Sequence, residues 1–386
     1  MKLLSLFSGI GAMELAARSM GWTTAAFCEI DPFCRLIIAK RFPGIPIHND
    51  IKTLGGGEYG TVDVVCGGFP CQDLSAAGKM AGLFEGKRSS LWFDMLRIVR
   101  TVRPPFVLAE NVRGAVNMAL DHVISGLRDA QYQVRAIIIP ASAVGAPHRR
   151  ERLFILGVRQ DVADACGKRF QWRGGLGVIV KTRALPADEQ PKGLGKGGLW
   201  PTPTVCGNNN RRGSGKSGDG LSTAVKWPTP RTGGMCGGSG AAQMMKDGLS
   251  ADEVKKIWSR GGGQLNPDWV ECLMGLPIGW TNPDVETPEP WPGWPAPMPG
   301  RAWMTPGACQ CGSTSKTSGR PLEKSTHLQS QAYTERGAGQ YAYEPPRIAA
   351  NIPNRAKRLK AIGNCNPPQQ YMPMLGVIQQ IDDILK

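Results

Sequence analysis

Cys71 has the residue type and the surroundings of a nucleophile. It lies in the run Gly67-Gly68-Phe69-Pro70-Cys71-Gln72, directly after the apolar segment 61–66. Thiolates are strong nucleophiles, although most free cysteines in proteins are small core residues. A polar loop of glycine and proline is a poor place for a core residue, and the glycines leave room for a planar ring beside the thiol. The setting of Cys71 therefore favours a reactive thiol.

Three further side chains could act on a substrate held near Cys71. Glu110 follows the apolar segment 107–109, where its carboxyl group could exchange a proton with a substrate or could cap a following helix. Arg150 and Arg152 alternate, so in an extended chain they would point the same way. Two guanidinium groups on one side suit a phosphate or a carbonyl group.

The N-terminal segment has the order of a nucleotide-binding unit. An apolar strand is predicted over 2–7, a turn over Ser8-Gly9-Ile10-Gly11, and a helix over 13–20. Glycines let the backbone approach a ligand, and the helix N-terminus offers free N–H groups. A second predicted strand, 23–28, ends at Glu29, and an acidic residue about 20 positions after the glycines suits ribose hydroxyls.

Two more acidic residues follow predicted strands. Asp31 precedes Pro32, so we expect it to cap the helix predicted over 33–41. A third strand is predicted over 45–48 and ends at Asn49-Asp50-Ile51, where the carboxylate could accept a hydrogen bond from an adenine amino group. Further strands are predicted over 61–66, 107–109, 137–139 and 153–158. Strands that alternate with helices predict an α/β fold with a doubly wound, mostly parallel sheet and ligands at the carboxyl ends.

The composition is that of a globular protein, and the net charge is compatible with binding to a polyanion. The chain has 386 residues, 41% of them hydrophobic, and a net charge of +15. Residues 159–264 hold 17 basic and 8 acidic side chains, a net +9. A basic surface attracts phosphate backbones, although it can also be a solvated face. No apolar run reaches the length of a membrane span, and 11 irregularly spaced cysteines without a secretion signal indicate reduced thiols in a cytosol.

Together these motifs resemble the DNA cytosine-5 methyltransferase family and stand in that family's order. The resemblance covers residues 1–158, 265–281 and 355–386, and it omits the basic region 159–264. The most specific blocks are Pro70-Cys71-Gln72 and Glu110-Asn111-Val112. The other matching blocks are Phe7-Ser8-Gly9-Ile10-Gly11, Glu29, Asn49-Asp50-Ile51, Arg150-x-Arg152, Leu265 to Glu271, Leu273 to Pro277 and Gly363-Asn364.

The resemblance implies a Rossmann-like methyltransferase that moves a methyl group from S-adenosyl-L-methionine to carbon 5 of a flipped-out cytosine in double-stranded DNA. Cys71 would attack carbon 6 of the ring, Glu110 would interact with ring N3, and Arg150 or Arg152 would favour the thiolate. The loop from Gln72 to Gly86 would close over the base. The implied cofactor contacts are Phe7, Gly9, Gly11, Glu29, Asp50, Ile51 and Asn364. The implied substrate contacts are Pro70, Gln72, Ser75, Asn111 and His148.

The chain departs from the family pattern at three places, one of which is the interval from Thr281 to Arg355, longer than the family usually needs. His148 stands where the family usually has Gln, and we expect it to keep a positioning role. Cys365-Asn366 follows Gly363-Asn364 where Ser-Val is usual, so Asn364 is the residue carried over as a cofactor contact.

The sequence divides into four regions: a catalytic and cofactor-binding domain (1–158), a smaller irregular target-recognition region (159–264), a family-like segment with a Pro/Gly-rich connector (265–354), and C-terminal helices that return to the catalytic domain (355–386). Helices are predicted over 356–362 and 372–384. Trp200-Pro201-Thr202-Pro203 recurs at 227–230 and suggests equivalent loops in the recognition region. Cys309-x-Cys311 lacks a second ligand pair, so we expect no metal.

Other functions remain open on the sequence. An amino methyltransferase is disfavoured, because Asn366-Pro367-Pro368 is followed by Gln369 and lacks the aromatic residue that this chemistry needs. An RNA cytosine-5 methyltransferase and a catalytically inactive DNA-binding relative are the alternatives. We expect a monomer in the cytoplasm of a bacterial cell or a phage-infected host, with no membrane partner.

Overall fold

The computed structural model describes residues 1–70, 91–116, 120–146, 148–167, 177–178, 203, 264–289, 345–346, 348–349 and 351–386. Several predictions fall outside these residues: those on Cys71, Gln72, Ser75 and the 72–86 loop, on most of the target-recognition region with its repeat, on the Pro-rich connector, and on Cys309-x-Cys311.

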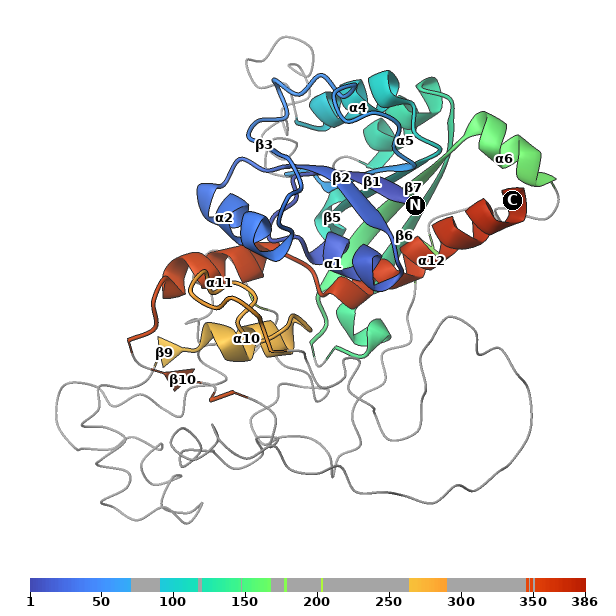
Figure 1. Cartoon of the computed structure of the whole chain (residues 1–386). Coiled ribbons are helices and arrows are strands. Elements are labelled where there is room, and N and C mark those ends of the chain that lie inside the picture. Colours follow the sequence, from blue (N-terminus) through green and yellow to red (C-terminus); the bar gives the residue numbers. More distant parts are fainter. Residues whose placement is uncertain are drawn as a thin grey trace, which may run out of the picture.

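One sheet organises the described part of the chain (Figure 1). Its order is β3-β2-β1-β4-β5-β7-β6-β8, and β7 alone runs antiparallel to its neighbours. The predicted doubly wound, mostly parallel sheet is confirmed. The strands are β1 (Lys2–Leu6), β2 (Thr23–Cys28), β3 (Ile47–His48), β4 (Val64–Gly68), β5 (Phe106–Val112), β6 (Tyr132–Pro140), β7 (Glu151–Arg159) and β8 (Gly177–Val178).

Successive strand residues point into two separate cores. Leu3 belongs to one apolar cluster and Leu4 to the other, and Val64 and Val65 divide in the same way. Because side chains alternate across a strand, a sheet that is covered on both faces needs apolar residues at every position. This requirement explains the uninterrupted apolar runs of the sequence.

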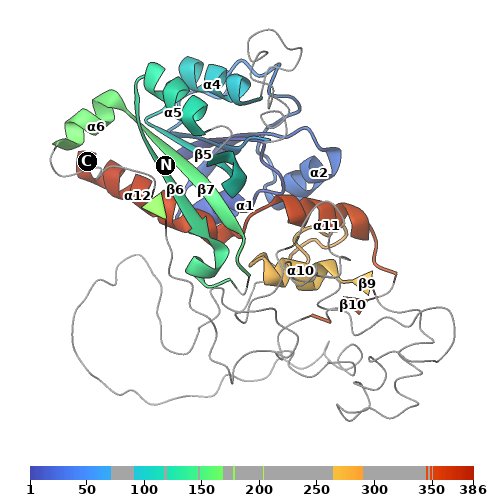
Figure 2. The same ribbon diagram turned by 180° about the vertical axis from the view of Figure 1, so that it is seen from behind.

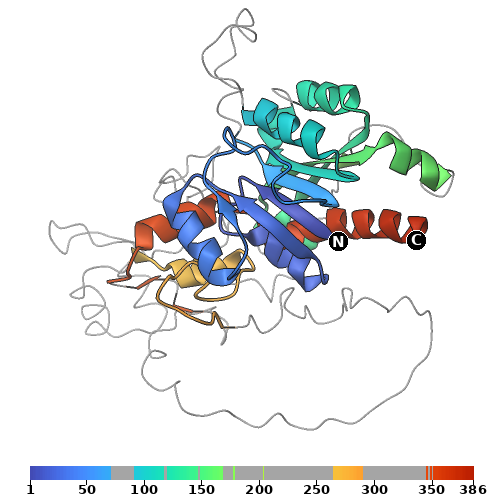
Figure 3. The same cartoon turned by 45° about the horizontal axis from the view of Figure 1, so that its top comes forward.

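Helices cover both faces of the sheet (Figure 3). One core contains residues of α1, α2, α10, α11 and α12, and the other contains residues of α4 and α5. The helices α4 and α5 have no counterpart among the sequence-based predictions. The helices are α1 (Ala12–Ser19), α2 (Pro32–Arg41), α4 (Leu91–Val102), α5 (Leu120–Asp129), α6 (Gln160–Cys166), α10 (Pro267–Leu273), α11 (Arg355–Asn364) and α12 (Pro368–Leu385). The short elements are the 3-10 turns Arg113–Val116 and Ala141–Val144 and the antiparallel pair β9 (Gln264–Leu265) and β10 (Ile348–Ala349).

The order of the strands fixes where a ligand can bind. β1 has β2 on one side and β4 on the other, and α1 and α4, which follow β1 and β4 in the sequence, pack on opposite faces. Ligands of such sheets bind outside the carboxyl ends of the strands at this switch point. The turn after β1 and the segment Phe69-Pro70 after β4 therefore border the same end of the sheet.

The last helix of the chain packs against the first. α12 lies on the face that also carries α1 (Figure 2), and Trp22 Nε1 donates to Gln379 Oε1 at 2.7 Å. Gln370 Nε2 donates to the backbone carbonyls of Ile139 and Arg150, at 2.7 and 2.8 Å. No helix in the described part of the chain is long and apolar enough to cross a bilayer.

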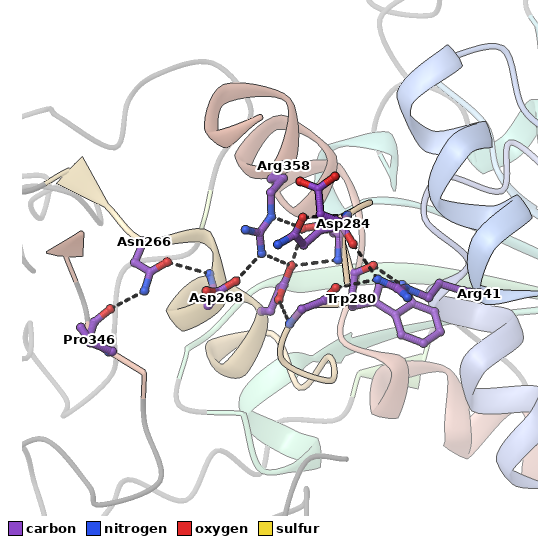
Figure 4. Close-up of polar contacts among 11 residues, drawn as sticks. Arg41, Asn266, Asp268, Trp280, Asp284, Pro346 and Arg358 are labelled. Atoms are coloured by element: carbon purple, nitrogen blue, oxygen red, sulfur yellow. Dashed lines mark hydrogen bonds and ion pairs between the residues drawn. The ribbon is translucent and has the colours of Figure 1, made fainter. Parts of the chain in front are cut away.

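A buried polar cluster fastens the segment 264–289 to this core (Figure 4). The Glu271 carboxylate accepts from the N–H of Gly279 (2.6 Å), the N–H and hydroxyl of Thr281 (2.9 Å to the nitrogen) and Arg358 Nη2 (2.8 Å). Arg358, on α11, also pairs with Asp268. Every group that points at Glu271 is a donor, so the charged carboxylate is the form that the geometry satisfies, although burial by itself raises the pKa of this residue.

A second arginine holds the far end of the same segment. Arg41, the last residue of α2, is buried and donates to the carbonyls of Gly279, Trp280 and Asn282 at 2.7–2.8 Å. Its five donors match several carbonyls at once, as only a guanidinium group can. The two arginines thus attach one loop to helices that are distant from it in the sequence.

Candidate active site

The glycine turn after β1 has the conformation and the space of a binding turn. Gly9 and Gly11 have φ of 56° and 76°, which L side chains rarely adopt. A Cβ on Gly11 would lie 2.6 Å from Cε2 of Phe42, so a methyl group cannot be placed there without movement. A Cβ on Gly9 would meet nothing within 4 Å among the described residues. The packing of Phe42 therefore requires glycine at position 11, and Gly9 faces open space.

Glu29 braces this turn. Its Oε2 accepts from the Gly9 N–H at 2.7 Å and its Oε1 from the Asp31 N–H at 2.8 Å. Burial raises the pKa of Glu29, and the two N–H donors oppose that shift. Each carboxylate oxygen has a second lone pair, so the group can still accept from a hydroxyl. Asp31 caps α2 as predicted, because its Oδ1 accepts from the N–H of Phe33 at 2.8 Å.

The other predicted cofactor residues lie beyond the neighbouring strand ends. Asp50, just after β3, is partly exposed and accepts from the Lys52 N–H at 3.0 Å, whereas Ile51 is buried. Phe7, partly buried, follows β1 with φ of 53°. Asn364 is exposed at the end of α11, a helix that packs against α2. In α11, one turn before Asn364, Lys360 pairs with Asp31 at 3.0 Å.

Glu110 occupies a space that Gly68 leaves open. The two residues are directly paired between β4 and β5, and a Cβ on Gly68 would lie 2.5 Å from Glu110 Oε2. Glu110 Oε1 pairs with Arg152 Nε at 3.0 Å, and both side chains are largely buried. Glu110 lies inside β5, so the helix-cap alternative is wrong. One oxygen is held by Arg152 while the other points toward Gly68, three residues before Cys71.

Asn111 fixes the chain that leads to Cys71. Its Nδ2 donates to the Phe69 carbonyl at 3.1 Å, and its Oδ1 accepts from the Val112 N–H at 2.8 Å. The Phe69 ring packs on Trp92, with centroids 5.3 Å apart, and Pro70 follows as an exposed residue. Asn111 is buried, which suits an orienting residue better than one that touches a substrate.

Arg150 differs from the sequence-based expectation. It precedes β7 and has φ of 24°, so the premise of an extended chain through Arg150 and Arg152 is wrong. Its guanidinium group is buried and donates to the carbonyls of Gly363 (2.9 Å), Cys365 and Pro203 (3.0 Å). Burial and the neighbouring Arg152 lower the pKa of Arg150 to about 9. Arg150 thus ties the C-terminal segment to the sheet, whereas Arg152 pairs with Glu110.

His148 is fully buried beside these arginines. Burial, with the charges of Arg150 and Arg152, lowers the pKa of His148 to about 3, so the ring is neutral at ordinary pH. Because the His148 ring has no exposed surface, it packs inside the protein and supports the segment around it. This position agrees with the expected positioning role and gives no support to a direct substrate contact in this conformation.

Sequence reasoning assigned no role to Glu14 and Ser5, which are buried, or to Ser8, which is half-buried and lies 2.8 Å from the Ser5 hydroxyl. Glu14 is in the first turn of α1 and 1% exposed. The sequence did contain a signal that Glu14 is buried. Glu14 lies three residues before Ala17, so helical periodicity puts it on the apolar face of the helix.

The described residues give no metal cluster and no disulfide. No group of three or more His, Cys, Asp or Glu residues lies close enough there to hold a metal ion. The six described cysteines are buried and form no disulfide with one another.

Comparison with known proteins identifies a family model and several relatives that match part of the chain. The family model of C-5 cytosine-specific DNA methylases matches residues 1–189. The type II methyltransferase M2.BsuMI of Bacillus subtilis is 38% identical over 164 residues, which are 40% of this chain and 41% of that protein. M.AquIA of Picosynechococcus sp. is 32% identical over 192 residues, 44% of this chain and 75% of that protein. The matched region thus spans about two fifths of the first of these relatives and three quarters of the second.

A solved structure matches the whole chain at the level of the fold. A mutant of Spodoptera frugiperda DNMT2 superposes with a TM-score of 0.55 over 98% of this chain and 99% of its own, at 15% sequence identity. This likeness is one of fold alone.

Proposed function

The chain belongs to the C-5 cytosine-specific DNA methylase family, and from this premise we propose that it transfers a methyl group from S-adenosylmethionine to carbon 5 of cytosine in double-stranded DNA. The observation that carries the proposal is the arrangement at the carboxyl ends of β4 and β5. Glu110 directs one oxygen over Gly68 while Arg152 holds the other, and Asn111 fixes Phe69, two residues before Cys71.

The residues at the neighbouring strand ends fit S-adenosylmethionine. Gly9 faces open space, so backbone there can approach a ligand closely. Glu29 and Asp50 supply acceptors at the ends of β2 and β3, where ribose hydroxyls and an adenine amino group need them. Phe7, Gly11, Ile51 and Asn364 complete the proposed set. When bound, this cofactor supplies an electrophilic methyl group.

Cys71 begins the proposed reaction by forming a bond from its sulfur to carbon 6 of the cytosine ring. Carbon 5 gains electron density through this addition and can then accept the methyl group. Loss of the proton on carbon 5 re-forms the ring double bond and breaks the carbon–sulfur bond, which returns the thiolate. The methyl group thereby replaces that proton, which passes to water.

Glu110 assists the addition at ring N3. Negative charge develops on the ring as the thiolate adds, and a carboxyl group that shares or donates a proton at N3 relieves it. Arg152 holds the Glu110 side chain in position and adds positive charge to the site. We assign Arg150 and His148 to the support of this segment and Pro70, Gln72 and Ser75 to contacts with the base.

The target is a flipped-out base in duplex DNA, because carbon 5 and carbon 6 are inaccessible to a thiol inside a base stack. We assign sequence recognition to residues 159–264, whose net charge of +9 suits a phosphate backbone. Catalysis then belongs to 1–158, with 265–354 as a connecting segment and 355–386 as returning helices. A monomer acting in a bacterial or phage-infected cytoplasm completes the proposal.

The two alternatives share the same site and differ in substrate or activity. An RNA cytosine-5 methyltransferase would use the same thiol, and the separate basic region is the observation that favours duplex DNA over it. An inactive DNA-binding relative would have no need for a carboxylate held by Arg152 at the end of β5.

The test is transfer of a labelled methyl group from S-adenosylmethionine to duplex DNA of varied sequence and to RNA. Wild type and Cys71→Ser are compared, with duplex binding measured in parallel. We expect label in 5-methylcytosine from wild type alone and equal DNA binding by both. Methylation of RNA in place of DNA would support the first alternative, and duplex binding without transfer to either would support the second.

A further inference from the structure

Two exposed arginines border the proposed active site. Arg113 follows directly after β5, and Arg149 precedes β7 by two positions. Their side chains are 58% and 65% exposed. Arg149 differs from its neighbours in the chain, because His148 before it and Arg150 after it are both buried. This short segment therefore turns a cation toward the solvent.

One carboxylate holds both arginines. Glu151, the first residue of β7, accepts from Arg113 Nη1 at 2.6 Å through its Oε2. Its Oε1 accepts from Arg149 Nε at 3.1 Å and from Arg149 Nη2 at 2.8 Å. The Glu151 side chain is only 18% exposed, so solvent meets the two cations much more than the anion between them. Each guanidinium group has five N–H donors and keeps some of them for a further acceptor.

The register of the sheet places these arginines close to Glu110. Val112 pairs with Arg152 across β5 and β7, so Arg113 and Glu151 are the next positions along the two strands. Glu110 lies three residues before Arg113, roughly 10 Å of extended chain. Arg152, which pairs with Glu110, directly follows Glu151. A duplex whose cytosine reaches Glu110 must therefore pass its backbone close to the two exposed guanidinium groups.

We propose that Arg113 and Arg149 bind the phosphate backbone beside the target cytosine, and that Glu151 holds them in place before the DNA arrives. The inference rests on the proposed function for its partner, duplex DNA, but it concerns binding and not methyl transfer. Guanidinium groups bind phosphate oxygens through paired hydrogen bonds. Such contacts fix the orientation of a duplex and carry no sequence information. They suit base flipping, because a nucleotide that rotates about its backbone needs that backbone to be held.

The test is the salt dependence of duplex binding by the full-length protein. Wild type, Arg113→Gln and Arg149→Gln are compared on several duplexes of different sequence. A lost phosphate contact releases fewer counterions, so the slope of log affinity against log salt concentration should become less steep by about 0.9 in each variant. Between about 50 and 200 mM salt, the affinity of wild type should thus fall about 3–4 times more than that of either variant. The change should be the same for every duplex.

Three further variants separate a phosphate contact from other effects. Arg128→Gln is the matched control, because Arg128 is an exposed arginine in the last turn of α5, near the amino end of β6. That end is opposite to the carboxyl end of β5, since both strands run antiparallel to β7. Arg128→Gln should keep the slope of wild type. Arg113→Lys and Arg149→Lys retain the charge and should also keep it, whereas a packing role for the arginines would give no such rescue.

The outcomes separate this inference from the proposed reaction. Slopes of Arg113→Gln and Arg149→Gln equal to that of wild type would overturn the inference, even if wild type methylates duplex DNA. An equal loss of slope in Arg128→Gln would also overturn it, because net charge alone would then explain the effect. Reduced slopes in a protein that transfers no methyl group would refute the proposed reaction and leave the inference standing. Binding to RNA alone would overturn duplex DNA as the partner.

Discussion

Replacing Arg358 by methionine should destabilise the protein far more than the loss of an ordinary surface ion pair. Arg358 is 1% exposed, and its guanidinium group contacts Glu271, Asp268 and the Thr281 hydroxyl. Methionine fills a similar volume but leaves the Glu271 carboxylate, 0% exposed, without its cation. A buried charge that loses its partner costs about 3–5 kcal/mol. This is a large part of the roughly 5–15 kcal/mol by which such domains are stable.

The assay is guanidinium chloride unfolding, followed by circular dichroism and by tryptophan fluorescence, to which the buried Trp269 and Trp280 beside the cluster contribute. The matched control is Arg113→Met. Arg113 pairs with Glu151 at 2.6 Å but is 58% exposed, so its loss should cost less than about 1 kcal/mol.

A double variant tests the cause. Adding Glu271→Gln to Arg358→Met removes the unpaired charge, so the double variant should lie about 0.5–3 kcal/mol above the stability expected from adding the two single effects. If Arg358→Met unfolds no more easily than Arg113→Met, or if the two single effects simply add, then the buried carboxylate is not what makes Arg358 important.

Three further predictions follow from other contacts. Gly68→Ala puts a methyl group 2.5 Å from Glu110 Oε2, so methyl transfer should fall on the order of 100-fold while duplex binding is kept; unchanged transfer would contradict the assigned position of Glu110. Gly11→Ala combines φ of 76° with a 2.6 Å approach to Phe42 and should cost about 1–3 kcal/mol of stability, measured by denaturant unfolding beside Gly21→Ala, which has a similar φ and open space. The folded-state pKa of Glu14, about 7, exceeds its ordinary value of 4.5, so its contribution to stability is complete below pH 4.5 and is lost as the pH rises through about 7. Wild type should therefore lose about 3 kcal/mol over that range relative to Glu14→Gln, and parallel stability curves for the two proteins would refute this.

The local sequence was sufficient to predict the sheet and the residues at the ends of its strands. Apolar runs predicted β1, β2 and β4, and those of β1 and β4 are followed by glycines. The parallel arrangement of these strands followed from the helices between them. The cap at Asp31 was equally local, because an acceptor before Pro32 needs only the first turn of its own helix. Boundaries were less well predicted: strand 137–139 extends to β6 (Tyr132–Pro140), and strand 45–48 shortens to β3 (Ile47–His48).

Arg150 shows where local reasoning stopped. An alternating pair of arginines predicts two side chains on one face of a strand. The guanidinium group of Arg150 instead donates hydrogen bonds to the carbonyls of Gly363 and Cys365, more than 200 residues away in the sequence. Nothing in its own segment indicates these partners. The positive φ of Arg150 removes it from the strand register that the prediction assumed.

The sequence by itself therefore determined the sheet, the family and the set of groups available for chemistry, because strand periodicity, glycine turns and helix caps depend on residues close together in the chain. Tertiary structure decided which of those groups face a ligand and which support the fold. Arg152 pairs with Glu110, Arg150 anchors the C-terminal segment, and burial raises the pKa of Glu14 on α1. The role and the charge of a buried ionisable group depend on its solvation and its partners, and both are set by elements that meet only when the chain has folded.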